Sequence, residues 1–102
     1  MRDMRYVVMH QAGPKWAPGV PMFEQQGLQA HVDHYRTWLD GGKLAQGGPI
    51  LDSSAAVGMM IPVAGLPRDE VEAHAAADPA VQSGLLTFEI RTWMVGMQKS
   101  ER

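Results

Sequence analysis

The chain has 102 residues, of which 45% are hydrophobic and 20% charged, and this makes one globular domain over residues 1–102 the expected organisation. Nine basic and eleven acidic residues give a net charge of −2 without a basic stripe, so we expect no nucleic-acid partner. The chain has no cysteine, which excludes disulfides, thiolate metal ligands and a thiol nucleophile.

The apolar runs of the sequence are short. Residues 6–9 are only four consecutive apolar residues near the start, too few for the core of a signal peptide. The longest apolar stretch, residues 55–66, is interrupted by Gly58, Pro62 and Gly65, whereas a membrane span needs about 20 apolar residues. We therefore expect a cytoplasmic protein without a membrane partner.

The first elements in chain order are a strand, a loop and a long helix. Residues 5–10 are β-branched and aromatic, which predicts a strand, and the glycines and prolines of residues 13–21 predict a long loop. Residues 23–40 contain few breakers before Gly41-Gly42, which predicts a helix. Helical spacing predicts its buried face, formed by Leu28, Val32, Tyr35 and Leu39, with His31 and Trp38 on the flank.

The second half of the chain predicts a hairpin, a helix and a last strand. Residues 43–51 and 55–63 read as two strands joined by a turn at residues 52–54, the first of them containing Gly47-Gly48-Pro49. Pro67 opens a helix that runs to about Ala77, and residues 79–83 predict one more helical turn. Residues 85–95 alternate as a final strand.

This β-α-β-β-α-β order predicts an α+β, ferredoxin-like fold, an antiparallel sheet with both helices on one face. The other face of the last strand would carry Thr87, Glu89, Arg91 and Trp93, which is too mixed for an open surface. We therefore expect self-association, a homodimer or a higher homo-oligomer, in which two sheets face each other as a dimeric α+β barrel.

His31 and Asp78 are the candidate catalytic residues. An imidazole takes and returns a proton near neutral pH, and a carboxylate beside it would orient the ring and stabilise its charged form. The alternatives are a histidine at the edge of the core and a helix cap, since Asp78 precedes Pro79. His34 three residues after His31, with His10 as an unplaced addition, makes a metal site conceivable, but no third nitrogen ligand is evident and we expect no metal or other cofactor.

Short motifs follow one another in a recognisable order. They are Arg5-Tyr6-Val7-Val8, His31, Gly42-Lys43-Leu44 before Gly47-Gly48-Pro49, Asp78-Pro79 before Gly84, and Ile90-Arg91-Thr92-Trp93. In this order and spacing the chain resembles the YCII-related family over nearly its whole length. The resemblance implies a dimeric α+β barrel and an active site built on a His–Asp pair, which maps onto His31 and Asp78. Ala12 and Leu28-Gln29-Ala30 depart from the family pattern, which often has aspartate and arginine there.

One branch of that family eliminates hydrogen chloride from a chlorinated hydroxyquinone. We therefore expect a cofactor-free lyase or isomerase acting on a small cyclic or aromatic compound, with His31 as general base and Asp78 orienting it. The expected substrate-binding residues are Gly48, Pro49, Trp16, Trp38, Arg91 and Trp93. The alternatives are a non-catalytic dimer that binds a small ligand or serves as an accessory protein, and a cofactor-free monooxygenase of the related dimeric barrels.

Overall fold

The computed structural model of the chain describes residues 3–52 and 55–100. The expected element order is confirmed, with a short 3-10 helix added in the first loop. The elements are β1 (Asp3–Ala12), η1 (Met22–Glu24), α1 (Leu28–Asp40), β2 (Leu44–Pro49), β3 (Ala56–Pro62), α2 (Arg68–Ala76), α3 (Pro79–Gln82) and β4 (Leu86–Val95). The turn expected at residues 52–54 includes Ser53 and Ser54, which lie outside the described residues.

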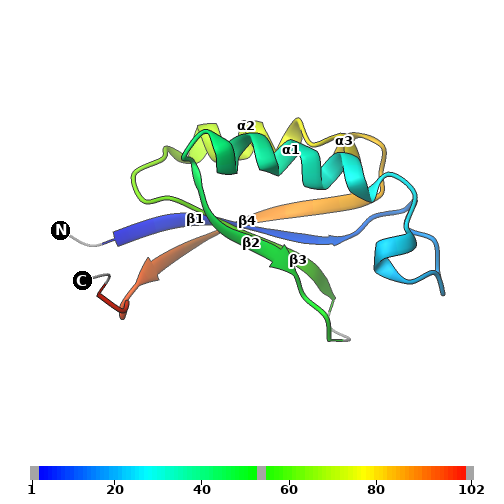
Figure 1. The fold of residues 1–102 in the computed structure, drawn as a ribbon, viewed down its shortest axis with the longest axis horizontal. Helices are drawn as coiled ribbons and strands as arrows, with labels where there is room; N and C mark the ends of the chain where they lie inside the picture. Colours follow the sequence, from blue (N-terminus) through cyan, green and yellow to red (C-terminus); the bar gives the residue numbers. More distant parts are fainter. Residues whose placement is uncertain (1–2, 53–54, 101–102) are drawn as a thin grey trace.

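The strands form one antiparallel sheet in the order β2-β3-β1-β4. The helices cover one face of this sheet and the other face is open, so the molecule has two layers (Figure 1). This α+β arrangement is compatible with a ferredoxin-like fold. Strand β1 lies inside the sheet and pairs with β4 from Asp3 opposite Val95 to Ala12 opposite Leu86. Side chains on the helix side of β1 are therefore held beneath α1.

The predicted helix over residues 23–40 is divided in two. The reason is Gly27, which precedes α1 with a left-handed φ of 95° that interrupts helical geometry. The side-chain amide of Gln25, which is buried, holds the segment before Gly27 in place. It accepts a hydrogen bond from the Ala17 N–H and donates to the carbonyl oxygens of Ala17 and Val20. These bonds fold the loop back on itself beside the start of α1.

The predicted buried face of α1 is wrong by part of a turn. The buried residues are His31, Tyr35 and Trp38, whereas Val32 is 37% and Leu39 47% exposed. Rings from other elements contact the buried residues: His10 of β1 lies against His31 and Tyr35, and His74 of α2 stacks on Trp38. Rings that carry polar atoms therefore occupy the centre of the helix–sheet interface. Val32 and Leu39, which were expected to be buried, instead lie beside an open cavity.

The main core is shared by the sheet and both long helices, and consists of Val8, Tyr35, Trp38, Leu44, Met60, Val71 and Ala75. A smaller cluster of Ala80, Leu85 and Leu86 packs with Trp16 and Leu28 below the start of α1. The two clusters fix α1 and α3 against the sheet. Residue 31 lies in the first turn of α1, and residue 78 immediately precedes α3. Within the described part of the chain, no helix is long and apolar enough to cross a membrane.

Candidate functional site

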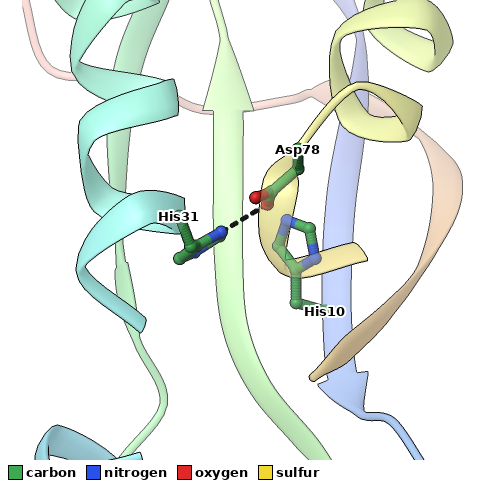
Figure 2. A group of neighbouring side chains, drawn as sticks. All are labelled: His10, His31 and Asp78. Carbon is green, nitrogen blue, oxygen red and sulfur yellow. Dashed lines mark hydrogen bonds and ion pairs between the residues drawn. The ribbon is translucent and has the colours of Figure 1, made fainter. Parts of the chain in front are cut away.

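The predicted proximity of His31 and Asp78 is confirmed. His31 lies in the first turn of α1 and is 7% exposed, while Asp78 immediately precedes α3 and has no exposed surface. Nδ1 of His31 lies 2.5 Å from Oδ2 of Asp78, and Figure 2 shows the two side chains pointing toward one another across the gap between their helices. The pair joins segments 47 residues apart in the sequence.

Asp78 both caps a helix and pairs with the imidazole. Its Oδ1 accepts a hydrogen bond of 2.9 Å from the Ala80 N–H, and Pro79 occupies the first helical position. Burial alone would raise the pKa of Asp78, but the hydrogen bond and charge of His31, with the Ala80 N–H, outweigh burial and lower that pKa. Asp78 is therefore ionised at neutral pH, so that Nδ1–H of His31 donates to it.

This hydrogen bond sets the tautomer of neutral His31. With the proton on Nδ1, Nε2 carries the free lone pair. None of the described residues forms a hydrogen bond with Nε2, and the residue lines a cavity. His31 therefore carries an acceptor nitrogen that has no hydrogen-bond partner among the described residues, on a side chain that lines the cavity.

His10 is a member of the site that the sequence did not place. It lies on the helix side of β1, fully buried, and its ring meets that of His31 edge to face with centroids 4.8 Å apart. Nδ1–H of His10 donates to the Thr87 carbonyl oxygen at 3.2 Å, and Nε2 accepts from the Tyr35 hydroxyl at 3.1 Å. The available signal was strand alternation, which places His10 on the face of Val8, a core residue.

Burial, and after it the neighbouring imidazole of His31, lower the pKa of His10 to about 4. Burial also raises the pKa of Tyr35, and the charge of Asp78 acts in the same direction. Both groups are therefore neutral at physiological pH. His10 therefore packs against the His31 ring as a neutral side chain and adds no charge to the His31–Asp78 pair.

His10, His31 and Asp78 are also the described residues that come closest to a metal-binding set. One potential ligand atom from each lies within 4.8 Å of the others (Figure 2). The combination considered from sequence spacing, with His34, is not formed, because His34 donates from Nε2 to the His74 carbonyl oxygen at 2.7 Å and stacks on the His74 ring. Nitrogens of His10 and oxygens of Asp78 are engaged in the hydrogen bonds described above, and a metal would have to replace several of them.

A cavity of about 280 Å³ lies beside His31, between α1, the first loop and strands β2 and β3. Trp16, Gly48 and Pro49 line it, in agreement with their expected place in the site. A Cβ at Gly48 would meet no atom within 4 Å, so the absence of a side chain there leaves open space. The remaining walls are largely apolar, with Met22, Phe23, Leu28, Val32, Leu39, Leu44, Val57, Met60 and Leu86.

Three residues expected at the ligand do not line this cavity. Trp38 is buried in the core and stacks on His74 at 4.0 Å. Arg91 and Trp93 occupy alternate positions of β4, whose Phe88 and Ile90 pack on the core, and strand alternation therefore turns both toward the open face. Arg91 lies 3.8 Å from Glu89 on that face. The charged residue that does line the cavity is Arg36 of α1, which is also exposed to solvent.

No protein-family model matches this chain, and comparisons with curated proteins and with solved structures also gave no match.

Proposed function

We propose that the chain is a cofactor-free enzyme in which His31 transfers a proton to and from a small ring compound held in the cavity. The observation that carries this proposal is that the two nitrogens of the His31 imidazole have different surroundings. Nδ1 is fixed by a buried carboxylate, and Nε2 is left to the cavity. A general base oriented by an acidic partner has this construction in unrelated enzymes.

The proposed reaction is a lyase or isomerase step. Nε2 of His31 takes a proton from a C–H or O–H of the ligand, and the electron pair left behind forms a new π bond. In an elimination the leaving group departs with its bonding pair; in an isomerisation the same proton returns to another atom of the ring. The imidazolium formed on the way is stabilised by the Asp78 carboxylate, and its proton is finally passed to the product or to water.

A second interpretation is that the cavity only binds a ligand. A histidine fixed by a backbone carbonyl would favour it, and His10 is fixed in that way. His31 is instead paired with a carboxylate, which favours proton transfer.

We further propose that the protein is a YCII-like homodimer whose open sheet faces pack together as a ferredoxin-like dimeric barrel. The strand order supports this assembly, and so does the apolar surface on the open face, where Met59 is 36% and Trp93 42% exposed. A second copy would cover both residues.

Hydrogen–deuterium exchange of ring ligands tests the proton-transfer step. A panel of cyclic ketones and hydroxyquinones is incubated in D₂O with the protein, and the loss of ring C–H signals is followed by proton NMR. We expect wild-type protein to accelerate exchange, and His31→Asn to lose roughly 10²–10⁴-fold of that acceleration. Asparagine is the matched replacement because it keeps an N–H donor near the position of Nδ1 and lacks Nε2.

Asp78→Asn should lose less, because the base remains and only its orientation and charge stabilisation are weakened. Arg68→Gln, on the exposed side of α2 and outside the cavity lining, should exchange at the wild-type rate. Equal exchange rates for wild type and His31→Asn across the panel would contradict the proposal for this ligand class.

A further inference from the structure

Arg36 is the one fixed charge among the described residues that line the cavity. The lining contains no lysine, aspartate or glutamate. His10 is neutral at physiological pH because burial lowers its pKa to about 4. None of the described carboxylates forms an ion pair with the Arg36 guanidinium, whereas the carboxylates of Asp3, Glu70, Glu72 and Glu89 each lie within 4 Å of a basic group. The cavity therefore has in its wall a positive charge that pairs with none of the described carboxylates.

The position of Arg36 on α1 relates it to the reacting group. It follows Val32 by four residues, so the two side chains share one helix face at the cavity. It follows His31 by five residues, which places the two backbone positions about 7.5 Å apart along the helix axis and about 140° apart around it. Both side chains nevertheless line the same cavity, so a ligand that contacts both groups must extend along α1 by at least the length of a ring with one substituent.

The walls between these two groups suit a ring. Aromatic and aliphatic side chains form most of the lining, among them Trp16, Phe23 and Met60. The hydroxyl of Tyr35, another lining residue, already donates to His10. An apolar cavity of about 150 Å³ is enough for benzene, and the cavity here is about 280 Å³. A sugar would bury several hydroxyl groups without partners on these walls.

We propose that the ligand class of this site is a compact ring compound with one anionic substituent, held by Arg36 at the substituent and facing Nε2 of His31 at the ring. This inference rests on the proposed function for the identity of the reacting group. The binding of the anionic substituent depends on Arg36 alone. An arginine takes a carboxylate or phenolate by charge-assisted hydrogen bonds.

Binding of matched ring compounds tests this assignment without any turnover. Benzoate, benzamide and benzylammonium have the same ring with a negative, neutral or positive substituent, and acetate has the charge without the ring. Each is titrated into ¹⁵N-labelled wild-type protein, and amide shifts of the cavity residues, such as Gly48 and Leu28, are followed by NMR. We expect benzoate to bind at least about tenfold more tightly than benzamide or acetate, and benzylammonium to bind most weakly.

Two variants separate the guanidinium from the rest of the site. Arg36→Gln should reduce benzoate affinity about tenfold, to that of benzamide, and should leave benzamide binding unchanged. Arg36→Lys should retain part of the preference, because it keeps the charge and loses the two-pronged geometry. Arg68→Gln is the matched control, an exposed arginine of α2 that does not line the cavity, and should bind benzoate as wild type does.

The inference is overturned if benzoate and benzamide bind wild type equally, if neither binds, or if Arg36→Gln keeps the preference for benzoate. Its failure is distinguishable from failure of the proposed function. Loss of the charge preference with His31-dependent exchange intact removes only the role of Arg36. Benzoate binding as expected, with exchange that does not depend on His31, removes only the catalytic role of the dyad.

Discussion

Burial of His10 as a neutral imidazole should make the stability of the protein depend on pH in a defined window. Burial lowers the pKa of His10 to about 4, while an imidazole in the unfolded chain titrates near 6.5. Between these two values the unfolded state binds the proton and the folded state does not. The free energy of unfolding therefore falls as the pH is lowered through this window.

The size of the effect follows from the two pKa values. From pH 7 to pH 5, the His10 proton should lower the free energy of unfolding by about 2 kcal/mol. His74, whose pKa is also lowered to about 4 by burial and by His34, acts in the same direction. The contribution of His10 must therefore be obtained as a difference between two proteins.

The perturbation is His10→Asn, which keeps an N–H donor near the Thr87 carbonyl and does not titrate. Urea unfolding of wild type and variant, followed by tryptophan fluorescence, is compared at pH 7 and pH 5. The variant will be less stable at pH 7, because the Tyr35 hydroxyl loses its acceptor, but it should lose about 2 kcal/mol less on acidification. If the two proteins differ in this loss by less than about 0.5 kcal/mol, the buried neutral state of His10 is refuted.

Three further predictions follow from burial, backbone contacts and the open sheet face. Val71→Asp should lower the free energy of unfolding by about 3 kcal/mol or more, measured by thermal or urea unfolding, because Val71 is 1% exposed. Val32→Asp, at the edge of the cavity, should change it by no more than about 1 kcal/mol. Equal costs for the two variants would mean that Val32 belongs to the core. Gly13→Ala should lower the free energy of unfolding by about 3 kcal/mol or more, since its Cβ would collide with the Gly84 carbonyl oxygen. Gly48→Ala, the control, should have a free energy of unfolding within about 1 kcal/mol of wild type. A tolerated Gly13→Ala would contradict the close approach of the two chain segments. Light scattering at micromolar concentration should give twice the 11.2 kDa chain mass, and Trp93→Glu should shift the protein toward monomer; a wild-type monomer at that concentration would refute the proposed pairing of sheets.

The sequence predicted the features that depend on local signals. Breakers and alternation gave the element order, and Asp78 before Pro79 marked the start of α3. The pairing of His31 with Asp78 was implied by the family resemblance, and two antiparallel helices on one sheet face are compatible with it, because the start of one then lies beside the end of the other. The element order and the start of α3 needed only periodicity and local signals.

The remaining features depend on contacts between distant segments. Helical periodicity identified an apolar face on α1. It could not predict that Tyr35 and Trp38 would define the buried face, because their contacts are with His10 and His74 of other elements. The early start of the helix was excluded by the hydrogen bonds of Gln25 to the preceding loop. Arg36 is exposed, and its place in the cavity wall could not be predicted from the sequence, because the cavity exists only when the loop and β2 are in place.

The protonation of the His31 ring is the most direct test of a base at the cavity. Two-bond ¹H–¹⁵N NMR spectra of the labelled protein, recorded where imidazole is neutral and assigned by comparison with His31→Asn, identify which nitrogen carries the proton. The geometry predicts the Nδ1–H tautomer for His31, with an unprotonated Nε2, and loss of this preference in Asp78→Asn. A wild-type His31 with its proton on Nε2 would present a donor to the cavity, could not accept a proton there, and would contradict the account.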